Sequence, residues 1–320
     1  MSLTLTNPLR PALLAAARSE RMERSISSSR LTRSLVAKFV PGASQQAAVD
    51  AVAALVSAGR FISVDYLGED VRHAGEAEQT VAAYLSLLDA YGTLEQPPTT
   101  AARPLEISVK LSALGQSLPG GQELALLNAR TICAAAEHVG AWVNVDAEDH
   151  TTTDSTLRIV TELRREFPTV ATVLQAYLHR TEEDCRALSG PGSRIRLCKG
   201  AYAEPAAVAF QDKEAVDASY LRCLRILMEG QGYPMVASHD PQMITAARAY
   251  AVETGRGSED FEIQMLYGIR DAEQGRLVDD GVHVRTYVPF GEDWYGYFMR
   301  RLAERPANLT FFLRALVGRR

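Results

Sequence analysis

The sequence lacks the features of several large classes of protein. It contains four cysteines in 320 residues, far apart and without metal spacing, so neither a disulfide framework nor a cysteine metal site is indicated. It has no run of 18 apolar residues and no apolar segment typical of a signal peptide near its start, so we expect neither a membrane span nor secretion. A net charge of −5 disfavours nucleic acid as a partner. These absences indicate a cytoplasmic globular protein.

Several catalytic motifs are also missing. No Gly-x-Gly-x-x-Gly follows an apolar run, no serine lies in a nucleophile elbow, and no His-x-His pair or carboxylate cluster has metal spacing. Hydrophobic residues make up 47% of the chain and charged residues 23%, which is ordinary for a globular protein. We therefore expect the chemistry to belong to a bound cofactor.

What the sequence does contain is a regular alternation of short apolar runs with amphipathic stretches. Buried strands are predicted at Phe61–Leu67, Leu105–Leu111, Ala141–Asp146, Val170–Leu178, Arg194–Cys198, Met235–Ser238, Phe261–Leu266 and Val282–Val288. Helices are predicted at 76–92, 121–138, 152–166, 181–189, 214–229, 241–254 and 268–279. Asp154-Ser155 and Asp240-Pro241 are expected to mark helix starts.

Such alternation predicts an α/β fold with a parallel sheet and crossover helices. Eight units in about 260 residues indicate a (βα)8 barrel, and a doubly wound sheet is the alternative. We expect a helical N-terminal region over residues 1–58 and a catalytic barrel over residues 59–320.

Polar residues gather where the predicted strands end. They include Lys110, Asp146, Gln175, Arg196, Lys199, Ser238, His239 and Tyr287. In a (βα)8 barrel these ends form one rim, so the convergence indicates a binding site, and its cations predict an anionic ligand. Structural interpretations remain open: Lys110 and Asp146 could form an ion pair inside the barrel, and His239 could be a core histidine.

A second group of candidates lies in the C-terminal segment, where Arg300 and Arg301 precede Glu304 by one helical turn. Adjacent guanidinium groups suit a small carboxylate that both grip, and Glu304 is spaced to hold one of them. The aromatic residues of 294–298 favour this interpretation over a solvated basic patch.

The ordered segments resemble the proline dehydrogenases over roughly residues 55–315. They are Ser108-Val-Lys110-Leu-Ser, Val145-Asp146-Ala-Glu148, Leu174-Gln175-Ala-Tyr177, Arg196-Leu-Cys-Lys199-Gly200-Ala201-Tyr202, Ala237-Ser238-His239, Gln264-Met-Leu266-Tyr-Gly268, and Tyr287-Val-Pro-Phe-Gly291 through Arg300-Arg301-Leu-Ala-Glu304. One segment alone is weakly specific, whereas the ordered set is highly specific. The length is similar to that of the stand-alone bacterial type.

The resemblance implies a distorted (βα)8 barrel whose last helix lies over the barrel mouth, and a non-covalent FAD. It implies that Arg300, Arg301 and Lys110 bind the proline carboxylate, that Tyr287 and Leu266 pack on the pyrrolidine ring, and that Glu304 steadies the arginines. Asp146 is expected to pair with the site cations. Flavin-contacting positions are Ala147, Gln175, Arg196, Lys199, Gly200, Ala201, Ser238 and His239, with Arg196 near flavin N5 and Tyr202 near the ring system.

The implied reaction is hydride transfer from proline C5 to flavin N5, which gives Δ1-pyrroline-5-carboxylate. A membrane quinone is the expected electron acceptor, with peripheral contact at the inner face of the cell membrane, and a pyrroline-5-carboxylate dehydrogenase is a candidate partner. A Schiff-base aldolase is the rival class, because it too is a (βα)8 barrel with a strand-end lysine. Lys110 or Lys199 would then be the nucleophile.

Overall fold

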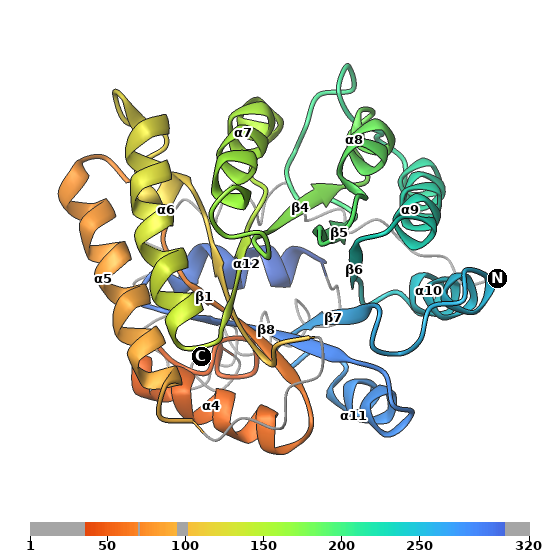
Figure 1. Cartoon of the computed structure of the whole chain (residues 1–320), viewed down its shortest axis with the longest axis horizontal. Helices are drawn as coiled ribbons and strands as arrows, with labels where there is room; N and C mark the ends of the chain where they lie inside the picture. Colours follow the sequence, from red (N-terminus) through yellow and green to blue (C-terminus); the bar gives the residue numbers. More distant parts are fainter. Residues whose placement is uncertain (1–35, 70, 95–101, 305–320) are drawn as a thin grey trace, which may run out of the picture.

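Eight parallel strands close into a barrel in the computed structural model, which describes residues 36–69, 71–94 and 102–304, except for the side chains of residues 300 and 302–304. The strands are β1 (Phe61–Tyr66), β2 (Leu105–Val109), β3 (Trp142–Val145), β4 (Ala171–Gln175), β5 (Arg194–Cys198), β6 (Tyr233–Ala237), β7 (Glu262–Leu266) and β8 (Val284–Phe290). Helices surround them (Figure 1). The predicted (βα)8 barrel is confirmed. The doubly wound alternative is wrong, because β8 pairs with β1 and leaves no open edge.

The helices follow the predicted periodic stretches closely. They are α4 (Gln45–Ser57), α5 (Ala74–Tyr91), α6 (Gly121–His138), α7 (Thr153–Arg164), α8 (Thr181–Leu188), α9 (Lys213–Glu229), α10 (Pro241–Glu253), α11 (Asp271–Asp279) and α12 (Trp294–Glu304). Asp240 caps α10 as predicted, since its carboxylate accepts from the Gln242 N–H at 3.0 Å.

Several predicted boundaries differ from the structure. α7 begins at Thr153, one residue from its predicted start, but Asp154-Ser155 does not mark that start. A short 3₁₀ turn precedes the helix, in which Asp149 accepts from the Thr151 N–H at 2.8 Å. β8 continues two residues past the predicted end at Val288, through Pro289 and Phe290. Pro289 lies opposite Asp65 of β1, and the Leu67 N–H donates to the Phe290 carbonyl at 2.7 Å. This bond uses the Leu67 N–H and the Phe290 carbonyl, so the N–H that Pro289 lacks is not needed. The turn comes at Gly291, whose φ is +126°.

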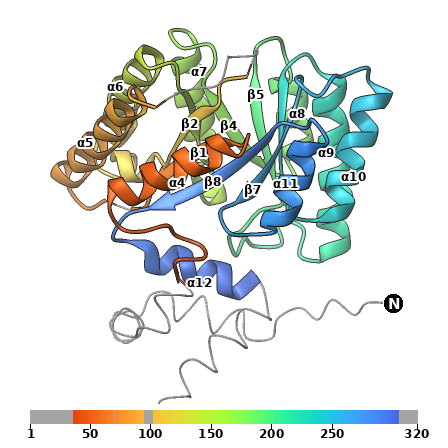
Figure 2. The same ribbon diagram turned by 90° about the horizontal axis from the view of Figure 1, so that it is seen from below.

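The helices at the two ends of the described chain, α4 and α12, lie in different positions relative to the barrel. α4 packs against β1 and β8, with Ala48, Val52 and Leu55 buried in the core, and so occupies the outer position that a helix after β8 would take. α12 instead lies outside one end of the barrel (Figure 2). Its Phe298 packs in one cluster with Leu266 of β7 and Tyr287 of β8. α12 therefore covers the carboxyl ends of these strands, as the resemblance implied.

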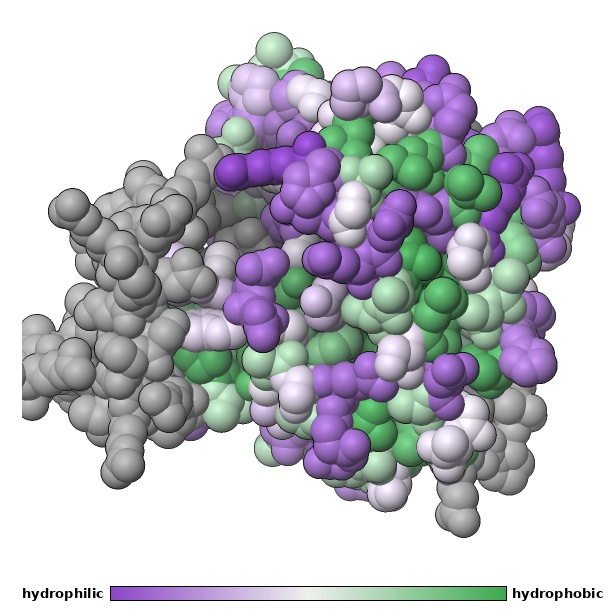
Figure 3. All heavy atoms as spheres, turned by 90° about the vertical axis from the view of Figure 1, so that its left-hand side faces the viewer, coloured by the Kyte–Doolittle hydropathy of each residue, from purple (hydrophilic) through white to green (hydrophobic). Residues whose placement is uncertain are grey.

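The outer surface is chemically mixed on the face formed by α5 and α6, where polar and apolar side chains are interspersed (Figure 3). Leu127 of α6 is the most prominent apolar side chain there, at 60% exposure. Across the part of the chain that the structure describes, no helix is both long and apolar enough to cross a membrane.

Candidate active site at the barrel mouth

A buried lysine between two carboxylates lies at the end of β2. The Lys110 Nζ is 2.6 Å from Asp65 Oδ2 of β1 and 3.8 Å from Asp146 Oδ2, just after β3. Burial acts to lower the pKa of Lys110, but the two carboxylates raise it above its ordinary value. Lys110 is therefore held as a cation. Its principal partner is Asp65, with Asp146 as a longer contact, so the predicted pairing with Asp146 is part of a triad.

Arg196 lies deeper in the barrel and is 3% exposed. Its Nε donates to Gln264 Oε1 at 2.5 Å, and one terminal nitrogen donates to Ser108 Oγ and to Asp146 Oδ1, both at 2.8 Å. The other terminal nitrogen donates to Ser63 Oγ at 3.0 Å and Glu106 Oε1 at 2.8 Å. All five donors of the guanidinium thus meet protein acceptors.

A charged layer continues below Arg196, toward the amino ends of the strands. Glu106 of β2 accepts from both Arg194 and Arg196, and Glu262 of β7 accepts from Arg285 at 2.7 Å. Burial alone would raise the pKa of Glu106, but Arg285, Arg194 and Arg196 hold it at about 2. This carboxylate is therefore ionised at neutral pH, and it supports the guanidinium of Arg196 from beneath.

An aromatic side chain connects the charged groups to α12. The Tyr287 hydroxyl donates to Asp146 Oδ2 at 3.0 Å, and the Arg196 guanidinium lies 5.5 Å from the centre of the Tyr287 ring. Tyr287 and Leu266 also pack with the buried rings of Tyr297 and Phe298. One turn along α12, the Arg301 guanidinium lies 5.1 Å from the Tyr297 ring centre. A cationic, aromatic mouth thus faces α12.

Residues expected to contact a flavin lie along the rim from β4 to β6. Gln175 donates to the Glu148 carbonyl at 2.8 Å, and Ser238 Oγ accepts from the Asp240 N–H at 3.1 Å. Lys199 Nζ contacts Asp217 at 2.5 Å and Asp240 at 2.8 Å. Amide, hydroxyl and ammonium groups on one rim are a donor set that suits the carbonyls and phosphates of a dinucleotide.

Gly200 is required by the local packing at this rim. Its φ is +115°, and a Cβ there would lie 2.3–2.5 Å from ring carbons of Tyr177. Any side chain would therefore displace either the tyrosine or the loop. The neighbouring Ala201 is exposed and Tyr202 is partly exposed, so the segment lies at the surface of the mouth.

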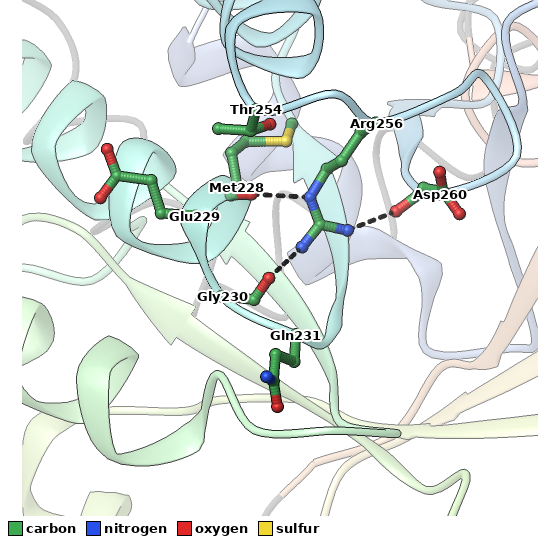
Figure 4. Close-up of a pocket in the computed structure, with 7 residues that line it drawn as sticks. All are labelled: Met228, Glu229, Gly230, Gln231, Thr254, Arg256 and Asp260. Atoms are coloured by element: carbon green, nitrogen blue, oxygen red, sulfur yellow. Dashed lines mark hydrogen bonds between the residues drawn. The ribbon is translucent and has the colours of Figure 1, made fainter.

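A hollow elsewhere in the protein belongs to the scaffold. Its lining includes Met228, Gly230, Arg256 and Asp260 (Figure 4). These residues precede β6 and β7, so the hollow lies at the end of the barrel opposite the mouth. Arg256 donates to the carbonyls of Met228 at 2.7 Å, Gly230 at 2.6 Å and Asp260 at 3.1 Å. Arg256 thus satisfies carbonyls at the end of α9.

Comparison with known proteins identifies the family. The sequence model of the family described as proline dehydrogenase matches residues 48–314. The chain belongs to the proline dehydrogenase family. It is 37% identical over 286 residues to proline dehydrogenase 1 of Bacillus subtilis (strain 168), which covers 89% of this chain and 92% of that protein. It is 38% identical to the proline dehydrogenase of Deinococcus radiodurans, covering 88% and 90%.

The barrel fold also occurs in a larger protein, proline utilization A. The barrel matches the crystal structure of proline utilization A from Bdellovibrio bacteriovorus, inactivated by N-propargylglycine, with a TM-score of 0.79 and 24% identity. The match covers 93% of this chain but 37% of that one, so the chain spans about a third of the length of that relative. At this identity the likeness shows the fold alone.

Part of the predicted site meets at the mouth. Asp146 contacts Lys110, Arg196 and Tyr287, and Leu266 packs with Tyr287 beneath α12. His239 is connected to this group by the Leu266 N–H, which donates to His239 Nε2 at 2.9 Å. Ala147 directly follows Asp146 at the end of β3. The side chains of Arg300 and Glu304 lie outside the described residues, although both positions belong to α12.

Three partners of Lys110 and Arg196 were missed in the sequence: Ser63, Asp65 and Glu106. Two more, Ser108 and Gln264, lie in the resembling segments but were given no role. Asp65 and Glu106 lie inside apolar runs that predict buried strands. Burying a charged side chain without a partner is strongly unfavourable. A charged residue inside an apolar run therefore predicts a buried ion pair, and this signal could have identified Asp65 and Glu106.

Proposed function

We propose that this protein oxidises L-proline to Δ1-pyrroline-5-carboxylate, with non-covalent FAD as hydride acceptor and a quinone as final electron acceptor. The observation that carries the proposal is the cluster of Lys110, Asp146, Arg196 and Tyr287 at the barrel mouth, covered by the helix that bears Arg301. Membership of the family supports proline as the substrate.

Substrate binding is assigned to the cations of the mouth. In the proposal, Arg300, Arg301 and Lys110 bind the proline carboxylate, and Glu304 steadies the arginine pair. Lys110 suits this role because Asp65 fixes its ammonium at 2.6 Å and keeps it charged. Tyr287 and Leu266 supply apolar surface for the pyrrolidine ring and exclude water from it.

FAD binding is assigned to the rim from β3 to β6. Ala147, Gln175, Lys199, Gly200, Ala201, Tyr202, Ser238 and His239 are the proposed contacts, and their mixture of donors fits the group. FAD when bound supplies the two-electron acceptor that the side chains lack. Because all five donors of Arg196 are used within the protein, a direct contact with FAD requires it to exchange one partner. In either case, the positive charge of Arg196 would stabilise negative charge that develops on a flavin bound at the mouth.

The rival aldolase is disfavoured by the state of Lys110. A Schiff-base nucleophile must be a neutral amine, whereas Asp65 and Asp146 raise the pKa of Lys110 and keep it protonated. A permanently charged ammonium serves carboxylate binding better than nucleophilic attack.

Partners and location complete the proposal. A quinone implies contact with a membrane, so we place the protein in the cytoplasm with peripheral contact at the inner face of the cell membrane. A pyrroline-5-carboxylate dehydrogenase is the proposed partner that consumes the product.

An absorbance spectrum tests the proposed function. Purified protein should show flavin bands near ~370 and ~450 nm, which proline should bleach under anaerobic conditions. Treatment with acid should release the flavin, since the attachment is non-covalent. A colourless protein that gains no flavin on incubation with FAD would contradict the proposal, and borohydride trapping of a substrate on Lys110 or Lys199 would favour an aldolase instead.

Replacing Arg196 by methionine should lower the reduction potential of bound FAD. A cation beneath the mouth stabilises the more electron-rich reduced form, and loss of a charged interaction worth about 1.5–3 kcal/mol corresponds to about 30–60 mV. Potentials measured by dye equilibration give the result. Arg196→Lys, which keeps the charge, should recover much of the shift, and equal potentials for all three proteins would remove Arg196 from the neighbourhood of the flavin.

Replacing Tyr287 by serine should reduce proline oxidation and increase the relative use of 4-hydroxyproline. The lost packing is worth on the order of 2–4 kcal/mol by analogy with large-to-small changes in cores, and the space left admits a ring hydroxyl. Tyr287→Phe is the matched control, because it keeps the ring and removes the hydroxyl that donates to Asp146. The measurement is kcat/KM for both substrates. A fixed ratio while both values fall would show that Tyr287 supports the site without contacting the ring.

A further inference from the structure

Arg270 precedes α11 in a backbone conformation that is unfavourable for an arginine. Its φ is 52° and its ψ is 43°, and within the described parts of the chain it alone among non-glycine residues has a positive φ. Such a residue persists only where its surroundings fix it, and these positions are concentrated at functional sites. Glycine would adopt the same conformation without strain, as Gly268 does two residues earlier. The side chain is therefore the feature to explain.

The side chain of Arg270 ties the ends of two neighbouring strands. Its guanidinium donates to the His239 carbonyl at 2.6 Å. His239 follows β6 and Arg270 follows β7, and these strands pair with each other in the barrel (Figure 1). Glu273 lies 3.9 Å from the guanidinium, so the bond to His239 is the closer contact. The guanidinium is partly buried, and such a charge-assisted bond is stronger than one between neutral groups.

The end of β7, just before Arg270, also holds the imidazole ring of His239. The Leu266 N–H donates to His239 Nε2 at 2.9 Å. Because Nε2 accepts this bond, the proton of the neutral ring lies on Nδ1, which is therefore the donor atom of His239. The backbone of the segment is fixed in turn, since Gln274 donates to the carbonyls of Leu266 at 3.1 Å and Ile269 at 2.8 Å.

We propose that Arg270 is a positioning residue for the cofactor site: its guanidinium holds His239 on the rim, with Nδ1 as the ring donor, and thereby sets the affinity for FAD. This inference rests on the proposed function, in which His239 contacts FAD. Glycine would relieve the strain at position 270 but would lose the guanidinium that donates to the His239 carbonyl. Stability and cofactor affinity consequently make opposite demands at this position.

Arg270→Gly and Arg270→Asn separate the side chain from the backbone, because both residues accept a left-handed conformation. FAD affinity is measured by titrating flavin-free protein and following flavin fluorescence, and the melting temperature of the flavin-free protein is measured in parallel. We expect the Kd for FAD to rise about 10-fold in both variants, from loss of a charge-assisted hydrogen bond. The melting temperature should stay level or rise. Arg276→Asn, which removes an exposed arginine from α11, should leave the Kd unchanged.

A double-mutant cycle tests whether Arg270 acts through His239. If it does, Arg270→Gly has no further effect on the Kd for FAD in a His239→Ala protein. Effects that add in full overturn the inference, as does an unchanged Kd in both Arg270 variants while wild type binds FAD and oxidises proline. A lower melting temperature accompanied by an unchanged Kd would show a purely structural role and also overturns it. A wild-type protein that binds no FAD overturns the proposed function and this inference together.

Discussion

Replacing Glu106 by glutamine should lower the free energy of unfolding by about 3–5 kcal/mol, the range found when one partner of a buried ion pair is removed. Glu106 is fully buried and accepts from Arg194 and Arg196. Glutamine would remove the negative charge that both guanidinium groups share, and its amide would direct a donor at one of them. Guanidinium chloride unfolding measures the change. The matched control is Glu166→Gln, which breaks an exposed pair with Arg130 and should stay within about 1 kcal/mol of wild type.

The difference in stability between wild type and Glu106→Gln should also depend on pH. The Arg partners lower the pKa of Glu106 from its ordinary 4.5 to about 2 in the folded protein. Its contribution to stability is therefore complete above the unfolded pKa and is lost as the pH falls from about 4.5 toward 2. The difference between wild type and Glu106→Gln should be largest at neutral pH and should narrow below pH ~4.5. A difference that is independent of pH would mean that the glutamate charge does not stabilise the fold.

Replacing Arg301 by lysine should raise the KM for proline about 10–150-fold while the flavin content stays the same. Lysine cannot reproduce bidentate binding of a carboxylate, and loss of a charged hydrogen bond is worth about 1.5–3 kcal/mol. Arg301 also contacts the ring of Tyr297, which helps hold its guanidinium on the face of α12. Steady-state kinetics and the affinity for tetrahydrofuroate, a carboxylate-bearing analogue, measure the effect.

Prolinamide separates binding of the carboxylate from binding of the ring, because it keeps the pyrrolidine ring and lacks the carboxylate. Wild type and Arg301→Lys should bind it with similar affinity if the arginine acts on the carboxylate alone. The exposed Arg276→Lys is the matched surface control and should behave as wild type. Unchanged affinity for tetrahydrofuroate in Arg301→Lys would place Arg301 outside the substrate site.

The strands and helices were largely predictable because each is short and buries one face. The predicted β5 and α6 have the observed bounds, since apolar runs and helical periodicity record burial directly. The errors fall at element ends. α11 was expected to begin at residue 268 and begins at Asp271, because Gly268 and Arg270 both adopt left-handed conformations that the apolar pattern does not reveal.

The site was predictable only in part. Lys110, Asp146, Arg196 and Tyr287 were found because they lie in the carboxyl-terminal half or at the end of apolar runs that a barrel brings to one rim. Their partners were not found in this way. Arg196 meets Ser63, 133 residues away in the chain, and Glu106, 90 residues away. Such pairs form only when the sheet closes, and no local pattern specifies which acid will lie beside which base.

The sequence by itself determined the alternation of strands and helices, the polar rim and the family, because these depend on local periodicity and on the order of short segments. Only the tertiary structure decided that α4 packs against β1 and β8, and that Asp65 rather than Asp146 is the principal partner of Lys110. The physical reason is that burial selects residue types along the chain. Pairing of charges depends on distances across the closed barrel, and those are set by the packing of all eight strands together.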